Sequence, residues 1–221
     1  MNFSKTKKYI SQHIELFGDE IYNSIDEKFK QTSTNLNSIS ETLDIFKASI
    51  ENCEKCNLSY TRNKFVFGSG DPDADLFLIG EGPGQDEDLK GKPFVGRSGK
   101  LLDNILKAIG FTRNHNVYIA NIVKCRPPEN RTPLTSEIEQ CLPYIKNQIA
   151  LVKPKLIVAL GKVAGQTLLK NNLMINEMRE ITYHYNAIPL VVTYHPAALL
   201  RNPSLKKDVW KDFQFIRDFM K

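Results

Sequence analysis

The four cysteines of the chain have the types and spacing of a metal-binding set. Cys53 and Cys56 form a C-x2-C pair, and Cys125 and Cys141 follow further along the chain. Four thiolates suit either a tetrahedral zinc ion or an iron–sulfur cluster, and spacing alone does not separate the two. We expect a cytoplasmic protein, in which disulfides are rare, so free buried thiols are the alternative to metal ligation.

Three other side chains have types that suit a flat heterocyclic ligand. Asn121 lies near the end of an apolar run, and a fixed amide offers the paired acceptor and donor that read a base edge. Phe94, in the glycine-rich segment GKPFVGRSG, could stack on a flat ring, and His195, directly after another apolar run, could stabilise charge. The structural alternatives are backbone hydrogen bonding for Asn121 and His195 and core packing for Phe94.

The segment GEGPG at residues 80–84 has three glycines around one proline. Glycine lets backbone N–H groups come close to a ligand, and successive N–H groups form a small anion-binding concavity. A tight turn without a ligand explains the isolated motif equally well. The segment does not match the GxGxxG fingerprint, so a nucleotide-binding protein that uses it for phosphate is only a weaker hypothesis.

Basic residues gather beside glycine and proline in the loops. The chain has a formal net charge of +5 and a pI near 8.9. This charge is compatible with a polyanionic partner but does not prove one. The basic residues of interest for such a partner are Lys124, Arg126, Arg131 and Arg201.

The elements that must position these residues alternate along the chain. Continuous apolar runs at 73–80, 116–123, 155–161 and 187–195 predict strands buried on both faces. Between and after them we expect helices, each with its own start signal. They run from Ser98 to Gly110, from a capping box of Ser136 and Glu139 to about Val152, over 161–170, and from about Leu205 with Val209, Trp210, Phe213 and Phe219 on one face.

This alternation predicts an α/β fold, a three-layer α/β/α sandwich around a central four-stranded, mostly parallel sheet. In such folds the working residues gather at the carboxyl ends of the strands. Every unusual loop of the chain follows a predicted strand, so we expect the site where these loops meet.

The N-terminal part has a different pattern. Apolar residues at helical spacing within residues 1–30, and a capping box of Ser38 and Glu41 that opens a helix through about Ile50, predict a helical extension over residues 1–50. Residues 51–221 then form the main domain. No apolar run approaches the roughly 20 residues of a membrane helix, so we expect no membrane span.

Five motifs in a fixed order resemble the family 4 uracil-DNA glycosylases, the bacterial and archaeal branch of their superfamily that carries a [4Fe-4S] cluster. The resemblance covers roughly Cys53 to Pro203. The motifs are CEKCNLSYTRNKFVFGSGDPDADLFLIGEGPG, GKPFVGRSGKLLDNIL, NIVKCRPPENRTP, ALGKVA and HPAALLRNP.

The resemblance implies a monofunctional DNA glycosylase of base excision repair. Such an enzyme flips uracil out of double- or single-stranded DNA and hydrolyses its N-glycosidic bond, which leaves an abasic site. We expect it to act as a monomer. The alternative is a non-catalytic iron–sulfur or zinc DNA-binding module, which would tolerate the loss of Asn121 and His195.

The resemblance also implies a role for each matched residue. Cys53, Cys56, Cys125 and Cys141 would bind the [4Fe-4S] cluster. Glu81 and Gly82 would line the uracil pocket, Phe94 would stack on the base, Asn121 would read its Watson–Crick edge and His195 would donate to uracil O2. Lys124, Arg126, Arg131 and Arg201 would hold phosphates, and Leu199, or else Leu200, would fill the gap left by the base.

One difference from the wider superfamily concerns the attacking water. Gly82 stands where the best-known uracil glycosylases have an aspartate, so a direct carboxylate base is missing at that position. Glu81 and Glu87 are then the candidates that orient the water.

Overall fold

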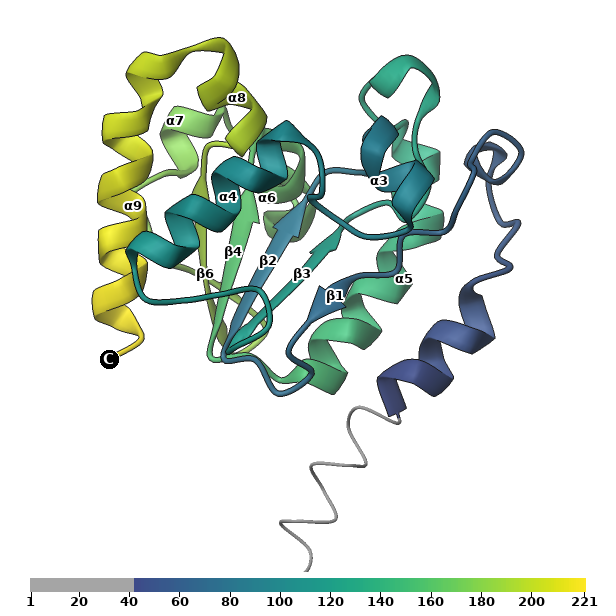
Figure 1. Ribbon diagram of the computed structural model, residues 1–221, viewed down its shortest axis with the longest axis horizontal. Coiled ribbons are helices and arrows are strands. Elements are labelled where there is room, and N and C mark those ends of the chain that lie inside the picture. Colours follow the sequence, from purple (N-terminus) through teal and green to yellow (C-terminus); the bar gives the residue numbers. More distant parts are fainter. Residues whose placement is uncertain (1–41) are drawn as a thin grey trace, which may run out of the picture. The chain divides into compact units, whose positions relative to one another are not determined.

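A six-stranded sheet forms the centre of the computed structural model, which describes residues 42–221. The strand order is β1-β3-β2-β4-β6-β5 (Figure 1). The strands are β1 (Ser69–Gly70), β2 (Leu76–Gly80), β3 (Val117–Asn121), β4 (Leu156–Leu160), β5 (Tyr183–Tyr185) and β6 (Ile188–Thr193). The helices of seven residues or more are α4 (Arg97–Ala108), α5 (Thr135–Val152), α6 (Lys162–Leu169), α9 (Lys206–Phe219) and a helix whose described part is residues 42–50.

The shorter helices lie in the loops that carry the candidate residues. They are η1 (Asn57–Ser59), α3 (Gln85–Lys90), η2 (Pro128–Asn130), α7 (Ile175–Met178), α8 (Pro196–Arg201) and η3 (Pro203–Leu205). The α3 helix follows the GEGPG turn directly and α8 follows β6 closely, so both begin at the carboxyl ends of strands.

The four predicted strands are present and pair in parallel as β3-β2-β4-β6. The expectation of four strands was wrong, because β1 and β5 add antiparallel pairs at the two edges. These edge strands are two and three residues long. Segments this short cannot show the periodicity by which a strand is recognised in a sequence.

Burial on both faces explains why the central strands are continuously apolar. In β2, Phe77 and Ile79 pack into one core cluster, whereas Leu76 and Leu78 pack into the other. Residues of α5 and α6 cover the first face, and residues of α4, α8 and α9 cover the second (Figure 1). The predicted three-layer α/β/α sandwich is therefore confirmed.

Two predicted N-caps were wrong by two residues each. The α4 helix begins at Arg97, and its N-cap is Gly96 rather than Ser98. The α5 helix begins at Thr135, and the Glu137 carboxylate accepts a 2.7 Å hydrogen bond from the N–H of Leu134, so Ser136 and Glu139 do not form the capping box. In a capping box the glutamate stands three residues after the N-cap, and Glu137 has this spacing from Leu134.

The closing helix α9 presents a narrower apolar face than predicted. Val209, Phe213 and Ile216 are buried against the sheet. Trp210 and Phe219 are 40% and 41% exposed, so they do not share the buried face.

The compact unit that contains the sheet begins at Thr42 rather than at residue 51. Leu43 is buried in the core, and Phe46 packs edge-on against Phe67 and Tyr144, with ring centroids 5.7 and 6.3 Å apart. Residues 42–50 therefore belong to the domain. The features predicted for residues 1–41 lie outside the described residues. No helix within residues 42–221 is long and apolar enough to cross a membrane.

Candidate active site

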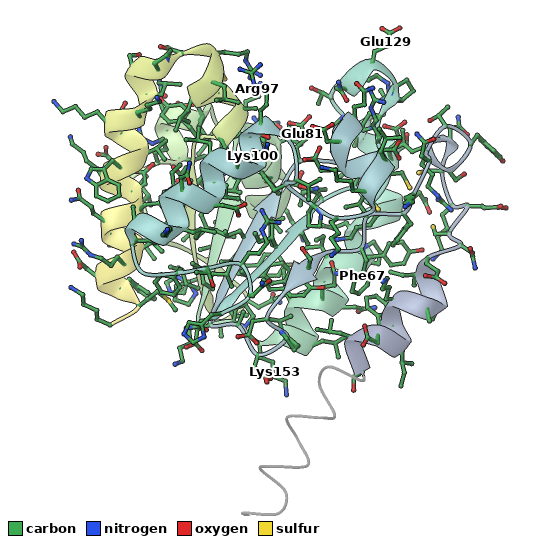
Figure 2. All side chains as sticks on the ribbon, viewed as in Figure 1. Phe67, Glu81, Arg97, Lys100, Glu129 and Lys153 are labelled. Carbon is green, nitrogen blue, oxygen red and sulfur yellow. The ribbon has the colours of Figure 1, made fainter. Side chains whose placement is uncertain are left out.

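A cavity of about 390 Å³ lies at the carboxyl ends of the parallel strands. Figure 2 shows Glu81 at this end of the sheet and Lys153 at the opposite end. The loops after β2, β3 and β6 line the cavity, together with the segment that leads into α4. The predicted convergence of loops is confirmed for these three strands. We call this cavity the base pocket.

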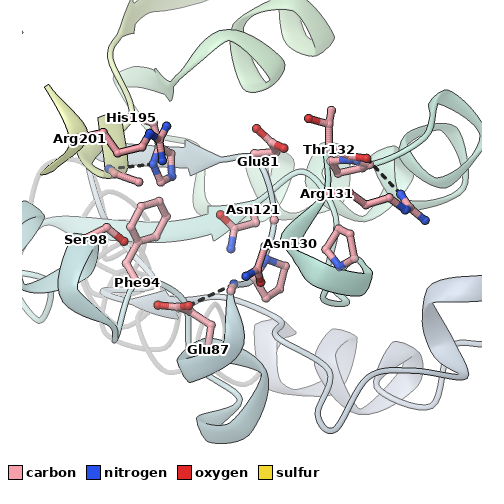
Figure 3. A pocket seen from close by; sticks show the side chains of 16 residues that line it. Glu81, Glu87, Phe94, Ser98, Asn121, Asn130, Arg131, Thr132, His195 and Arg201 are labelled. Atoms are coloured by element: carbon pink, nitrogen blue, oxygen red, sulfur yellow. Dashed lines mark hydrogen bonds between the residues drawn. The ribbon is translucent and has the colours of Figure 1, made fainter. Parts of the chain in front are cut away.

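Asn121, the last residue of β3, points its amide into the base pocket (Figure 3). Its side chain is almost fully enclosed, with 2% of the residue exposed, and its Oδ1 atom has no hydrogen-bond partner. Within residues 42–221 only Ser69 has another such buried, unpaired side-chain atom. An unsatisfied buried oxygen costs about 1–3 kcal/mol, so it indicates a position kept for a ligand.

Gly80 lets Asn121 and Phe94 lie close together. A Cβ atom at Gly80 would lie 2.4 Å from Asn121 Oδ1 and 2.7 Å from Phe94 Cζ. Both distances are shorter than a van der Waals contact. The last glycine of β2 therefore leaves the space in which the amide and the ring meet.

Phe94 is held in a strained conformation at the wall of the pocket. Its φ is 52°, in the left-handed region that non-glycine residues rarely adopt. Its carbonyl accepts a 2.7 Å hydrogen bond from Arg113. The ring lies 5.3 Å from the imidazole of His195, measured between centroids, with a tilt of 31°. Strain that the surroundings maintain in this way is typical of ligand-binding positions.

His195 is the N-cap of α8, and a backbone hydrogen bond to its ring determines which ring nitrogen carries the proton. Its Nδ1 accepts a 3.1 Å hydrogen bond from the N–H of Ala197, so Nδ1 carries no proton. Burial, with a smaller contribution from the positive charge of Arg201, lowers the pKa of His195 to about 4. The imidazole is therefore neutral near pH 7, and its proton is on Nε2, which is free to donate to a ligand.

The two candidate carboxylates have different environments. Burial raises the pKa of Glu81 above its ordinary value, and the nearby charge of Lys162 opposes this shift. Glu87 accepts hydrogen bonds from the N–H groups of Gly84, Val95 and Gly96, at 2.8–3.1 Å. Both oxygens of Glu87 thus accept from backbone, so Glu87 holds two loops of the pocket together.

The four cysteines together line another, much smaller cavity. All four are free thiols. Cys53 Sγ accepts from the hydroxyl of Tyr144 at 3.1 Å, Cys125 Sγ accepts from Arg62 at 3.3 Å and Cys141 Sγ accepts from the N–H of Lys124 at 3.3 Å. Donors that point at sulfur stabilise thiolates. Within residues 42–221 no three histidine, cysteine or acidic side chains are arranged to hold a metal ion.

Comparison with known proteins agrees with this geometry. A family model described as the uracil DNA glycosylase superfamily matches residues 67–214. A Type-4 uracil-DNA glycosylase of Archaeoglobus fulgidus is 39% identical over 184 residues, which cover 80% of this chain and 92% of that relative. One of Thermotoga maritima is 37% identical over 185 residues, which cover 82% and 96%. The chain belongs to the type-4 family of the uracil DNA glycosylase superfamily.

The predicted DNA contacts of this family member fall into two groups. Arg131 and Arg201 line the base pocket, and Arg126 lies in the same loop as Arg131 and bonds Asn130. Lys124 was predicted wrongly, because it is 0% exposed and its ammonium donates to Asn121 O and Gln148 Oε1. Burial lowers the pKa of Lys124 to about 7, and the thiols of Cys141 and Cys125 act in the opposite direction.

The residue expected to fill the gap in the DNA also changes. Leu199 is 2% exposed and packs in the core cluster beneath α8, so it cannot enter DNA without leaving the core. Leu200 is 41% exposed on the same short helix. The alternative that the sequence left open is therefore the better candidate.

Several residues of the site carry no sequence signal of their own. Ser98 and Thr132 line the pocket, Lys162 acts on Glu81 and Arg113 holds the strained Phe94. Ser98 lies within the glycine-rich segment GKPFVGRSG, which could have indicated it. Nothing in the sequence around Arg113 indicates its partner, because the contact spans 19 residues.

Proposed function

We propose that this chain is a uracil-DNA glycosylase that extrudes uracil from DNA and hydrolyses its N-glycosidic bond, which leaves an abasic site. The observation that carries this proposal is the unpaired, buried Oδ1 of Asn121 beside Phe94 and a neutral His195. The relatives named Type-4 uracil-DNA glycosylase support the same conclusion.

Asn121 reads the Watson–Crick edge of the extruded base. Uracil presents O4 as an acceptor and N3–H as a donor, and N3–H supplies the hydrogen bond that Asn121 Oδ1 lacks. The amide Nδ2 then donates to O4. Cytosine presents the reverse pair and leaves both amide groups unsatisfied, provided that the amide keeps one orientation. Phe94 stacks on the base while Asn121 reads it.

His195 and Glu81 act on the bond that breaks. Negative charge builds on uracil O2 as the glycosidic bond lengthens, and the Nε2–H of His195 donates to it. Donation by a neutral imidazole needs no proton transfer. Glu81, whose pKa is raised by burial, orients the water that attacks the sugar. Glu81 is preferred to Glu87 for this role because Glu87 already accepts three hydrogen bonds from backbone N–H groups.

Three arginines and one leucine hold the DNA. Arg126, Arg131 and Arg201 bind phosphates around the pocket, so the affinity for DNA falls with salt. Leu200 fills the space that the extruded base leaves. Its neighbour Leu199 anchors α8 in the core and makes this contact rigid.

The four cysteines, which line one cavity, could hold either a zinc ion or an iron–sulfur cluster. The resemblance to the family 4 enzymes favours a [4Fe-4S] cluster, which Cys53, Cys56, Cys125 and Cys141 would hold. It would anchor the loop after Cys125, and no step of the hydrolysis needs an electron.

The test is incubation of the purified protein with an oligonucleotide that contains one uracil, followed by alkali. Cleavage at the uracil is expected, and an intact strand would contradict the proposal. The alternative, a DNA-binding module without catalysis, predicts binding without cleavage and no effect of His195→Ala or Asn121→Ala. Iron and sulfide analysis of the same preparation tests the cluster, and zinc in place of iron would refute it.

A further inference from the structure

Lys124 is an unusual residue because its ammonium is completely enclosed. The residue is 0% exposed, and its Nζ donates to the main-chain oxygen of Asn121 at 3.0 Å and to Gln148 Oε1 at 2.6 Å. None of the ion pairs found in residues 42–221 includes Lys124. A buried charge without a counter-charge is strongly unfavourable, so its partner must be sought nearby.

The neighbouring cysteines would supply the missing negative charge when they hold a metal centre. The N–H of Lys124 donates to Cys141 Sγ at 3.3 Å, and Cys125 is the next residue in the chain. Metal ligation keeps thiols ionised, and four thiolates give such a centre net negative charge. Arg62, which donates to Cys125 Sγ, is a second cation beside the same centre.

The other end of Lys124 holds the strand that reads the base. The side chain folds back three residues and fixes the carbonyl of Asn121, whose amide side chain enters the base pocket. Gln148 is itself fixed, because its Nε2 donates to the carbonyl of Phe67 at 3.0 Å, whereas its 3.4 Å contact with the hydroxyl of Tyr118 is too long to add much. The peptide after Asn121 is thus held by a braced donor, which limits how far the amide can turn.

We propose that Lys124 is a positioning residue that couples the cysteine centre to uracil recognition: its ammonium holds the Asn121 carbonyl and takes its counter-charge from the cysteine thiolates. This inference rests on the proposed function. It assigns no contact with DNA or uracil to Lys124. The hydrogen bond and the charge are separable, because a substitution can remove the charge and keep an N–H donor.

The test compares Lys124→Met, which keeps the length but removes both donor and charge, with Lys124→Gln, which keeps an N–H donor and removes the charge. Lys124→Met should lower kcat/KM on uracil DNA about 10- to 100-fold, the usual effect of losing a hydrogen bond from a charged group. Lys124→Gln should recover part of this loss. Affinity for DNA that contains an abasic-site analogue should not change, because no base is read there.

The counter-charge is tested without catalysis. Both variants should lose iron to a chelator faster than the wild-type protein, as followed by visible absorbance and iron analysis. The matched control is Tyr118→Phe, which removes a hydroxyl from the same Gln148 and touches neither Asn121 nor the thiols. It should leave kcat/KM and iron loss unchanged. If Lys124→Met does not fold, Lys124→Gln alone tests the charge.

Three results would overturn the inference. They are a metal-loaded Lys124→Met with the kcat/KM of the wild-type protein, an equal loss in Tyr118→Phe, and wild-type iron retention in both Lys124 variants. A wild-type protein that releases no uracil would instead contradict the proposed function. Iron retention would then still decide whether Lys124 and the centre depend on each other.

Discussion

Two cavities of equal size lie at opposite ends of the sheet, and they differ in how their walls are built. The base pocket and a second cavity, the opposite cavity, each measure about 390 Å³. The opposite cavity is formed by α5, the loop into β4, the end of α6 and the β5-β6 hairpin. Its lining residues are Lys146, Ile149, Ala150, Lys153, Pro154, Lys170, Tyr185, Asn186 and Ile188.

The base pocket contains groups that are unfavourable for stability. The Oδ1 of Asn121 is buried without a partner, and burial lowers the pKa of His195 to about 4. The opposite cavity has exposed lysines and apolar side chains, and no lining atom of it is among the buried unpaired ones found in residues 42–221.

The two cavities therefore do not differ in volume. They differ in whether a buried polar atom in the wall lacks a hydrogen-bond partner. A chain tolerates an unpaired buried amide where a ligand will complete it. Backbone strain does not separate the cavities, because Lys153, Lys170 and Asn186 of the opposite cavity have a positive φ, as Phe94 does. Substitutions in the base pocket should therefore affect catalysis far more than stability, and substitutions in the opposite cavity should not affect catalysis.

The largest effect is expected from Asn121→Ala, which removes the amide that reads uracil. We expect kcat/KM on uracil DNA to fall about 10³-fold, the upper range for loss of a preorganised donor or acceptor. Thermal stability should not fall, because the buried Oδ1 has no partner to lose. The matched control is Asn130→Ala, an exposed asparagine of the same pocket, which should cost far less. Equal losses in the two variants would refute base reading by Asn121.

The next effect concerns Glu81 and the pH profile. Glu81 must be ionised to orient water. Because its pKa is raised, kcat/KM should fall on acidification at a pH above 4.5, the ordinary pKa of a glutamate. His195 stays neutral until about pH 4, so it does not cause this limb. Glu81→Gln should lower kcat/KM about 10²-fold and flatten the acid limb, whereas His195→Ala should lower kcat and keep the limb. An acid limb that persists in Glu81→Gln would exclude Glu81 as the group.

A smaller effect is expected from Gly80→Ala, which adds one methyl group between Asn121 and Phe94. The new Cβ would lie 2.4 Å from Asn121 Oδ1, so the amide must move. We expect a loss of about tenfold to 100-fold in kcat/KM, because small misplacements of positioning groups are costly. Gly110→Ala is the control: its φ is 86° but no atom lies within 4 Å of the new Cβ. It should lower the Tm and leave kcat/KM unchanged.

The sequence predicted the features that depend on apolar pattern and loop position, which are the central strands and the edge of the sheet where their loops meet. Long buried strands produce continuous apolar runs, and parallel strands bring their following loops to one edge, so the sequence alone places Asn121 and His195 at the same edge. The edge strands β1 and β5 could not be predicted, because their few residues form strands only through pairing with β3 and β6.

The errors in the site share one physical cause, which is the direction of a side chain. A lysine in a basic loop was expected to face phosphate, but Lys124 folds inward onto Asn121. Glu87 was expected to face water, but it binds three backbone N–H groups, and on α8 the buried and exposed positions fall to Leu199 and Leu200. Composition and spacing do not contain these directions, because tertiary contacts decide them.

The smallest effect is expected in the opposite cavity, and it is the sharpest test of the comparison. Lys146→Ala removes an exposed cation, and Tyr185→Phe removes a hydroxyl from a half-buried ring. Neither residue approaches the base pocket, so kcat/KM on uracil DNA should stay within about twofold of the wild-type value, the usual limit for surface changes of up to ~0.5 kcal/mol. Steady-state kinetics at two salt concentrations would also detect a contribution to DNA binding. A tenfold loss in either variant would mean that the opposite cavity serves the reaction. A buried polar atom without a hydrogen-bond partner would then no longer distinguish a functional cavity from an inert one.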